Sequence, residues 1–340
     1  MLPFLLYASA VAAASIPTLP NMKNLVLFGD SYTDEGRLGY IFGHNALPPP
    51  GQLLPATSDT SVGDYTWGRV AATKAGAMLY NYAVGAAMVT NNVTSHYMSN
   101  INGPFPSISE YEIPAFKADL GYKGLYPDRK PENTVYGYWI GTNDLGIDGF
   151  LGDKQVKGTT ISSFVEAIFK DFDELYKLGG RQFVLLNTGP LDVSPMYAAI
   201  ENGGTGDNSY WGNKKNFNTT ELQVKIQQYT TSANTMFETG VPYYLLTKRR
   251  WPGATFSVFD VHSLLLDLRA DPQKWFTAPY NVTWSWKGCG DNGCYQSNDP
   301  KTSYMWYDEV HISGRTSEIV GTEFLEVVKG KSKYGSYYRS

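Results

Sequence analysis

The chain has 340 residues, 42% of them hydrophobic and 18% charged, so it is long and apolar enough to fold around a substantial core. Its formal net charge of −4 offers no basic field, and we expect neither a nucleic-acid partner nor binding to anionic membranes. No linker interrupts the sequence. We therefore predict one domain over residues 15–330, a flexible tail over residues 331–340, and a monomer.

Residues 1–14 form a short apolar segment that ends in Ala12-Ala13-Ala14. This pattern predicts a secretory signal peptide, cleaved near Ala14 or Ser15. A membrane span needs about 20 apolar residues, and this run is shorter, so we expect no stable membrane insertion. Three sequons, at Asn92, Asn218 and Asn281, agree with a secreted, extracellular glycoprotein.

The first predicted strand, residues 25–28, leads directly into the turn residues Gly29 and Asp30 and then into Ser31. A serine at this point stands at the carboxyl edge of a parallel sheet, where open α/β folds keep their active sites. Ser31 is therefore the candidate nucleophile. The alternative is an ordinary corner between a strand and a turn.

Further strand-like runs span residues 78–83, 135–140, 182–187 and 255–260. The clearest helix carries apolar residues at helical spacing from Ile161 to Tyr176, with Ser163 and Glu166 as a capping pair and Gly179 as its end. Two more helices are predicted over residues 218–240 and 313–329. This alternation predicts a mainly parallel sheet covered on both faces. Residues 46–65 and 274–304 show no periodicity and are predicted to be long surface loops.

The two cysteines, Cys289 and Cys294, enclose only four residues. In an oxidising compartment this spacing predicts a local disulfide, while two free thiols or a metal clip are the alternatives. Zinc would need further ligands, and the four histidines are scattered without ligand spacing. We therefore expect no metal site.

A serine nucleophile needs a base, normally a histidine whose other ring nitrogen is held by a carboxylate. His44 and His96 lie in proline-rich and polar stretches, and the position of His262 favours a helix cap or the core. His311 follows Asp308 by three residues, just ahead of the last predicted helix, so one loop can supply both the base and its acid. The same Asp-x-x-His pattern also fits a helix entry without a catalytic role.

An attacked carbonyl also needs donors for its oxyanion. Asn143 lies in Gly141-Thr-Asn143-Asp144, directly after the strand at 135–140, and is expected at the same sheet edge as Ser31. The Gly-x-Ser-x-Gly pattern of the α/β-hydrolases is absent, because Thr33 stands where its second glycine would be.

The sequences at 29–31, 141–144 and 308–311 resemble, in this order, the motif blocks of the GDSL or SGNH hydrolases. The wider strings at 28–37, 139–144 and 303–309 are similar to those of the secreted fungal acetylesterases of carbohydrate esterase family sixteen. The resemblance implies a flavodoxin-like, three-layer α/β/α sandwich with a mainly parallel five-stranded sheet. It also implies ester hydrolysis without a cofactor.

Carried across by position, the resemblance makes Ser31 the nucleophile and a backbone oxyanion donor, and Asn143 the side-chain donor. His311 becomes the base and Asp308 the acid that orients it. The family's remaining donor, a glycine N–H, falls within residues 81–86, where Gly85 and Ala86 are both candidates. Alanine can serve if the turn does not require a positive φ.

The resemblance implies a serine esterase that hydrolyses short acyl esters, acetyl above all, on plant cell-wall oligosaccharides. The aromatic residues of the stretch 274–307 suit either sugar rings or ordinary packing, and they include Trp275, Trp284, Trp286 and Trp306. One alternative is a GDSL lipase or phospholipase acting on longer acyl chains, although no amphipathic lid helix is present. A non-catalytic glycan-binding protein is the other, and the complete set of serine, asparagine, aspartate and histidine disfavours it.

Overall fold

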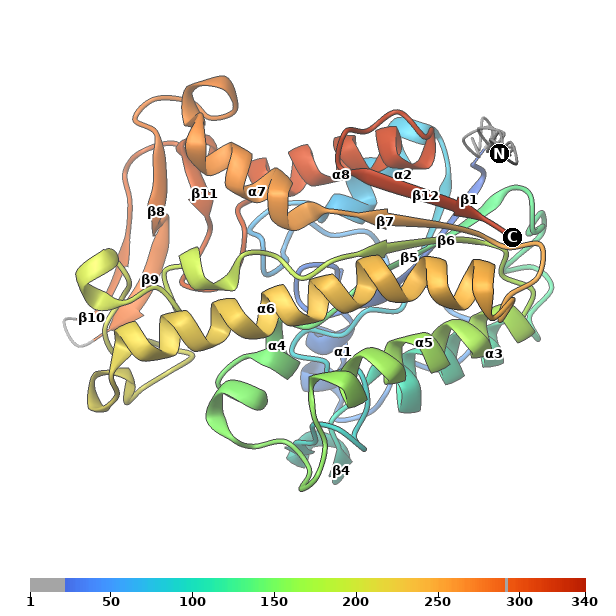
Figure 1. The fold of residues 1–340 in the computed structure, drawn as a ribbon, viewed down its shortest axis with the longest axis horizontal. Coiled ribbons are helices and arrows are strands. Elements are labelled where there is room, and N and C mark those ends of the chain that lie inside the picture. The colour runs from blue at the N-terminus through green and yellow to red at the C-terminus, as the bar shows by residue number, and fades with distance from the viewer. Residues whose placement is uncertain (1–21, 291–292) are drawn as a thin grey trace, which may run out of the picture.

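A central sheet organises the computed structural model, which describes residues 22–290 and 293–340 (Figure 1). The strand order is β12-β7-β6-β5-β1-β2. The strands are β1 (Asn24–Gly29), β2 (Met78–Asn81), β5 (Thr134–Trp139), β6 (Gln182–Leu186), β7 (Thr255–Phe259) and β12 (Gly335–Arg339). The first five run parallel, as predicted, and β12 pairs antiparallel with β7. The predicted signal peptide lies outside the described residues.

Helices cover both faces of this sheet, which confirms the predicted three layers (Figure 1). One face carries α2 (Trp67–Ala75), α7 (Val261–Ala270) and α8 (Gly314–Val328). The other carries α3 (Ile113–Asp119), α5 (Ile161–Lys177) and α6 (Thr219–Pro242). The short helices α1 (Arg37–His44) and α4 (Thr142–Leu145) follow β1 and β5 in the chain.

The period-two pattern of β1 explains how it binds both layers. Leu25 and Leu27 pack in the core on the α8 side, whereas Val26 and Phe28 pack in the core on the α3 side. All four side chains are fully buried. Full burial of such a side chain contributes roughly 1.5–3 kcal/mol, so the strand that precedes Ser31 is fixed from both faces.

The C-terminal residues were predicted to be a flexible tail, and this prediction is wrong. Residues 335–339 form β12, the sixth strand of the sheet. Tyr337 packs against the core on the α8 side and Tyr338 against the core on the α3 side. Tyrosine favours strands because its ring covers a pleated surface well, and this preference outweighs the polar glycine, serine and lysine around it.

The cap of α5 also differs from the prediction. Thr160 is the N-cap, since its hydroxyl accepts from the Ser163 N–H and the Ser163 hydroxyl accepts from the Thr160 N–H. The helix begins at Ile161, so the capping pair lies three residues earlier than Ser163 and Glu166. Glu166 instead accepts hydrogen bonds from Tyr244 and Arg250.

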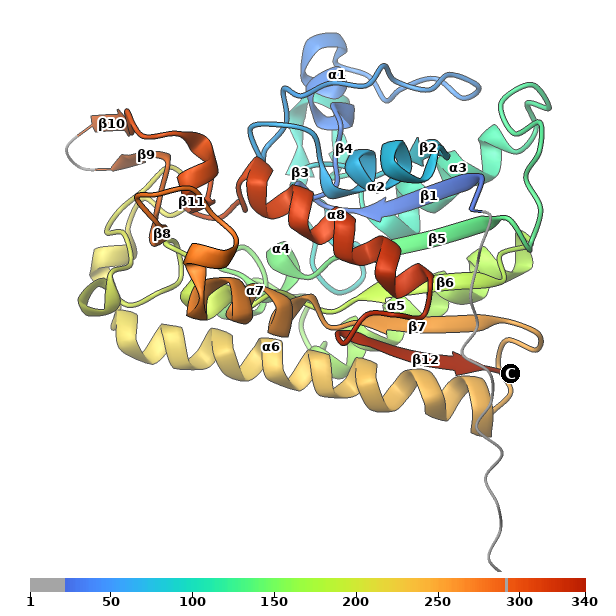
Figure 2. The ribbon, with the colours of Figure 1, turned by 90° about the horizontal axis from the view of Figure 1, so that it is seen from above.

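The two predicted loops turn out differently. Residues 46–65 contain neither a helix nor a strand, as expected. Residues 274–304 instead contain short strands: β8 (Asn281–Ser285) pairs with β11 (Tyr304–Trp306), and β9 (Lys287–Gly290) pairs with β10 (Gly293–Gln296). A further small pair is β3 (Tyr97–Met98) with β4 (Gly103–Pro104). β8, β9 and β10 contain polar residues and glycine in place of an apolar run, and β11 has only three residues, so no strand signal is present in this part of the sequence. Figure 2 shows β8–β11 gathered at one end of the molecule, beyond the sheet.

Cys289 and Cys294 lie opposite each other in the β9–β10 hairpin and form the predicted disulfide. The hairpin thus has a covalent bond across its two strands.

The strand order places the candidate site. The chain moves from β1 to β2 on one side and then continues through β5, β6 and β7 on the other. The topological switch point therefore lies between β1 and β5, where the loops after the two strands diverge and leave a crevice for ligands. Ser31 follows β1, and Asn143 follows β5.

Candidate active site

Ser31 lies in a tight turn immediately after β1. The Tyr32 N–H donates to Asp30 Oδ1 at 3.1 Å, and the N–H groups of Thr33 and Asp34 both donate to the Asp30 carbonyl at 2.9 Å. These bonds fix the backbone around Ser31, whose side chain is 7% exposed. Burial raises the pKa of the Asp30 carboxyl to about 6, with the Tyr32 N–H partly offsetting the effect.

Gly29 and Glu112 set the path of the chain into this turn. A Cβ on Gly29 would lie 2.3 Å from the carbonyl oxygen of Trp139 in β5, so only glycine fits there. The Gly29 N–H donates to Glu112 Oε2 at 2.9 Å, and the Val84 N–H donates to Glu112 Oε1 at 3.2 Å. One buried carboxyl therefore holds both segments that border the crevice. Burial raises the pKa of Glu112, and its backbone hydrogen bonds oppose the rise.

The loop between β11 and α8 carries the Asp-x-x-His sequence. Asp308 Oδ1 accepts from the N–H groups of Val310 and His311, at 3.1 and 2.8 Å. The Tyr307 N–H donates to the His311 carbonyl at 2.8 Å, which closes the loop. Ser313, the next polar residue, caps α8. The sequence thus builds a loop in which aspartate and histidine face each other.

Ser31, His311 and Asp308 form a continuous hydrogen-bonded array. The Ser31 hydroxyl lies 2.7 Å from His311 Nε2, and His311 Nδ1 lies 2.8 and 2.9 Å from the two Asp308 oxygens. Burial alone would raise the pKa of Asp308, but attraction to His311 and hydrogen bonds from His311 and Tyr210 outweigh it and lower the pKa. An ionised Asp308 can therefore accept a hydrogen bond from Nδ1–H, which leaves Nε2 without a hydrogen and able to accept one from the Ser31 hydroxyl.

Asn143 lies on the first turn of α4, at the edge that also carries Ser31. Its side-chain nitrogen donates to the Ala87 carbonyl at 2.9 Å. An amide nitrogen has two hydrogens, so one remains available for a ligand. The bond to Ala87 also links α4 to the segment that contains Gly85 and Ala86.

The structure separates the two candidates for the third donor. The Gly85 N–H already donates to Asp34 Oδ2 at 2.8 Å. Within the described residues, the Ala86 N–H has no acceptor, and Ala86 is exposed. The sequence admitted Ala86 as a donor on the condition that the turn has no positive φ, and the structure does not meet this condition, since Ala86 adopts φ 63°; its N–H nevertheless points to no acceptor among the described residues. Such a conformation costs roughly 1–2 kcal/mol for a residue with a Cβ.

Three supporting carboxyls had no functional role in the sequence analysis. Asp144 is fully buried and accepts from the Val89 N–H and the Thr94 hydroxyl, and burial raises its pKa to about 7. Asp34 and Glu112 hold Gly85 and Val84 in the way described above. Asp144 lies inside the motif block 141–144 and Asp34 inside the wider string 28–37, so the sequence carried a signal for both. Glu112 lies in no motif.

Tyr210 was also not among the residues that the sequence predicted for the site. Its hydroxyl donates to Asp308 Oδ2 at 2.8 Å across 98 residues of sequence. No pattern around Tyr210 predicts this contact.

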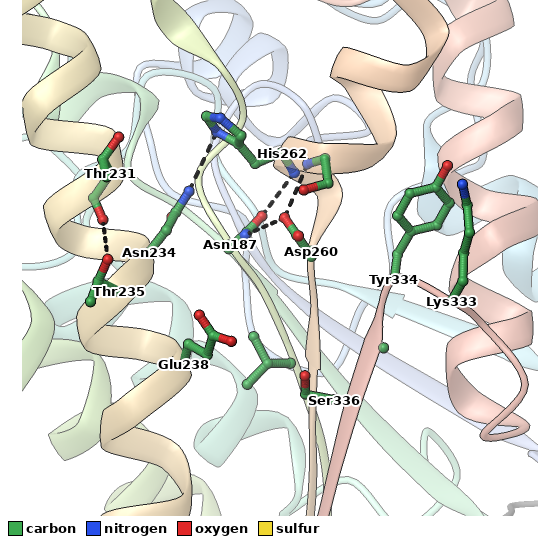
Figure 3. A pocket seen from close by; sticks show the side chains of 13 residues that line it. Asn187, Thr231, Asn234, Thr235, Glu238, Asp260, His262, Lys333, Tyr334 and Ser336 are labelled. Carbon is green, nitrogen blue, oxygen red and sulfur yellow. Dashed lines mark hydrogen bonds between the residues drawn. The ribbon is translucent and has the colours of Figure 1, made fainter.

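The remaining histidines lie away from Ser31. His262 lines a polar pocket with Asn187, Asn234 and Asp260, where the backbone N–H of His262 donates to Asn187 Oδ1 at 2.9 Å (Figure 3). This pocket adjoins β6 and β7, and β6 lies two strands away from β1. His44 stacks on Tyr40 in α1. Of the four histidines, His311 is therefore the one that contacts the candidate nucleophile.

Residues 22–290 and 293–340 contain no group of three or more His, Cys, Asp or Glu side chains arranged to hold a metal ion. In the same ranges, no helix combines the length and apolar character that crossing a membrane requires.

The tryptophans of the stretch 274–307 divide into two kinds. Trp286 and Trp306 are buried, and Trp275 packs against the core. Trp284 is 51% exposed and lines a pocket together with Tyr295 and Glu309. Packing thus explains three of the four, and one remains available at the surface, next to the Asp308 loop.

The sequons differ in accessibility. Asn92 and Asn218 are exposed, and Asn218 is also the N-cap of α6. Asn281 is partly buried, and its side-chain oxygen accepts from the Trp284 N–H. Their glycosylation stays a prediction.

The family model of the GDSL-like lipase/acylhydrolases matches residues 25–324, a range that contains all three motif blocks. The chain belongs to the GDSL-like lipase/acylhydrolase family. This GDSL-family chain is 44% identical to an acetylesterase of Hypocrea jecorina, over 94% of this chain and 92% of that one. It is 22% identical to GDSL esterase/lipase 1 of Arabidopsis thaliana, over 92% and 90% of the two chains.

Among solved structures, a lipolytic G-D-S-L family member from Veillonella parvula aligns with 90% of the GDSL-family chain and 96% of its own, at 10% identity and a TM-score of 0.38. The predicted membership of the GDSL family is confirmed by the family model.

Proposed function

We propose that this GDSL-family chain is a secreted serine esterase that removes short acyl groups, acetyl above all, from plant cell-wall oligosaccharides. The observation that carries the proposal is the 2.7 Å contact between Ser31 Oγ and His311 Nε2. It occurs in a chain that is 44% identical to an acetylesterase over nearly its whole length.

In the acylation step, Ser31 Oγ attacks the ester carbonyl and its proton moves to His311 Nε2. Asp308 holds the ring through Nδ1 and stabilises the imidazolium. The tetrahedral intermediate then collapses. The bond to the sugar oxygen breaks, and His311 returns the proton to that oxygen. The free hydroxyl of the sugar leaves, and an acyl group remains on Ser31.

In the deacylation step, a water molecule loses a proton to His311 and attacks the acyl carbonyl. The second tetrahedral intermediate expels Ser31 Oγ, which regains the proton, and acetate is released. Neither step consumes a cofactor.

In this proposal three groups stabilise the oxyanion in both steps: the N–H of Ser31, the N–H of Ala86 and the side-chain nitrogen of Asn143. Each such donor is worth a few kcal/mol of barrier. We assign the backbone role to Ala86 because the Gly85 N–H is already bonded to Asp34.

The sugar part of the proposal rests on the surface around Trp284. An exposed indole offers a face to the apolar side of a pyranose ring. The pocket beside it also contains polar groups that suit sugar hydroxyls, among them Asp207, Asn281 and Glu309.

Secretion rests on the N-terminal sequence, supported by the Cys289–Cys294 disulfide and the exposed sequons. Expression of the whole chain in a eukaryotic secretory host should release into the medium a protein that begins near Ser15. An N-terminus at Met1 in the cell fraction would contradict this part of the proposal.

The catalytic proposal is tested by comparing p-nitrophenyl acetate with p-nitrophenyl esters of long acyl chains, and then by assaying acetylated xylo-oligosaccharides. We expect kcat/KM to fall as the chain lengthens, and acetate to be released from the oligosaccharides. Ser31→Ala should abolish both activities. A preference for long chains would favour a lipase, and activity of Ser31→Ala within tenfold of the wild type would refute the assignment.

A further inference from the structure

The Asp308 carboxylate has a hydrogen-bond donor that its own loop does not supply. Oδ1 accepts from the backbone of Val310 and His311. Oδ2 faces His311 Nδ1 at 2.9 Å and accepts from the Tyr210 hydroxyl at 2.8 Å. Among the described residues, Tyr210 is the one donor to this carboxylate from another part of the chain. Its hydroxyl also lies 3.4 Å from His311 Nδ1.

Tyr210 and Tyr32 flank the His311 ring. The Tyr32 ring meets the imidazole edge-on, with the two centroids 5.9 Å apart, and the Tyr210 ring does the same at 5.5 Å. Tyr32 is buried and donates to the Val310 carbonyl, whereas Tyr210 is 41% exposed. Tyr210 therefore contacts the ring from the more open side.

The turn that carries Tyr210 is built around a buried asparagine. Asn208 Oδ1 accepts from the N–H groups of both Tyr210 and Trp211, each at 3.0 Å. Trp211 is buried in the core, and Asn208 also pairs as an isolated bridge with Gly290 of the disulfide hairpin. The position of the Tyr210 hydroxyl is thus set by a folded turn and not by a free loop.

We propose that Tyr210 is a positioning residue, whose hydroxyl holds the Asp308 carboxylate in line with His311 and shares its negative charge. The inference rests on the esterase function proposed above. By drawing charge toward Oδ2, the hydroxyl limits how strongly Asp308 stabilises the imidazolium of His311 before a substrate arrives. It also keeps the carboxylate from rotating away from Nδ1.

Other groups that titrate or carry charge surround this pair, and a change at Tyr210 leaves them in place. They are Asp30 and Tyr32 in the turn after β1, Glu309 and Tyr307 in the loop of Asp308, and Tyr295 in β10. Burial raises the pKa of Asp30 to about 6, so Asp30 contributes to the pH profiles of both the wild type and the variant. Burial and Asp308 raise the pKa of Tyr210, so it stays a donor throughout the assay range.

The test is Tyr210→Phe, assayed on p-nitrophenyl acetate from pH 5 to pH 9. We expect kcat to fall about tenfold, within the range of a weakened general base, with KM changed less than twofold. The acid limb of the kcat/KM profile should move to higher pH by about half a unit, because Asp308 without its donor stabilises the imidazolium more strongly.

The matched control is Tyr244→Phe, which removes a tyrosine donor to Glu166, a carboxylate far from the site. This variant should keep the wild-type kcat and the wild-type acid limb. Thermal unfolding of both variants identifies any loss that comes from misfolding.

Wild-type kcat in Tyr210→Phe would overturn the inference. A fall in kcat with an unmoved acid limb would also overturn it, because a packing role alone predicts that result. Other results would refute the proposed esterase function. If the wild-type protein does not hydrolyse esters, or if the Ser31→Ala variant still does, both that function and this inference are refuted.

Discussion

The carboxyl of Glu112 accepts a hydrogen bond from the backbone N–H of Gly29 at 2.9 Å, although the two residues are 83 positions apart. Its other oxygen accepts from the Val84 N–H. Gly29 leads to Ser31, the proposed nucleophile, and Val84 leads to Ala86, the proposed oxyanion donor, so one side chain sets the distance between the two segments. The two segments follow separate strands, β1 and β2. Because the buried Glu112 side chain links them, the packing of the core fixes the distance between them.

Glu112→Gln should therefore reduce both stability and activity. The glutamine side chain has one amide oxygen and one amide NH2 group, and the NH2 group would face one of the two N–H donors. That buried donor is left unpaired, at a cost of about 1–3 kcal/mol. Urea unfolding at pH 8 should show this loss, and kcat should fall more than KM rises. Glu132→Gln, at an exposed position, is the control. Unchanged stability at pH 8 would contradict the role given to Glu112.

Asn143→Ala should lower kcat by about 10² to 10³ and leave KM nearly unchanged, because an oxyanion donor meets charge that exists only as the transition state forms. Steady-state kinetics on p-nitrophenyl acetate measures both constants. The variant also loses the bond to Ala87, so its melting temperature must be compared with that of the wild type. A rise in KM as the main effect would make Asn143 a substrate ligand.

Asp308 and Glu309 are adjacent acids with different surroundings, and they provide a matched pair. Asp308 contacts His311, whereas Glu309 accepts from the Cys289 N–H in the disulfide hairpin. Asp308→Asn should lower kcat by about 10⁴ near neutral pH, because the orienting carboxylate is lost. Glu309→Gln should stay within tenfold of the wild type. The reverse ranking in kinetic assays would move the orienting role to Glu309.

Asp171 should make the protein less stable as the pH rises. Burial raises its pKa from its ordinary value of 3.8 to about 8, despite donors from Tyr138 and Ser109 at 2.6 and 2.7 Å. Between these two values the folded state binds a proton that the unfolded state has lost. The contribution of Asp171 to the free energy of unfolding is therefore greatest at low pH and is lost as the pH rises through about 8.

Asp171→Asn removes this titration. Its melting temperature should fall less than that of the wild type between pH 5 and pH 8.5, and it should be the more stable of the two at pH 8.5. Differential scanning calorimetry at the two pH values decides the matter, and equal falls would show that Asp171 does not titrate in this window.

Local patterns were sufficient for much of the fold. The apolar runs of β1 and β5 and the apolar spacing of α5 predicted these elements to within one or two residues. Asn218 and Ser313, predicted as the first residues of two helices, are their N-caps. The array of Ser31, Asp308 and His311 was predictable because the chemistry of each member appears in a short motif.

Contacts between distant segments were not predictable. Glu112 and Tyr210 reach the site across 83 and 98 residues, and neither has a local signature. The choice between Gly85 and Ala86 depends on the Asp34 carboxylate, which takes the Gly85 N–H once the chain is folded. β12 was missed because the few residues around its tyrosines resemble a polar terminus.

The pairing of β12 with β7 has a practical consequence for handling the protein. A chain shortened to Gly330 would leave the N–H and C=O groups of β7 unpaired along one edge, and an open strand edge is a template for a second molecule. Such a chain should self-associate at concentrations where the full chain does not. An affinity tag should therefore be added after Ser340, beyond the paired residues, and should not replace any residue from Gly335 onward.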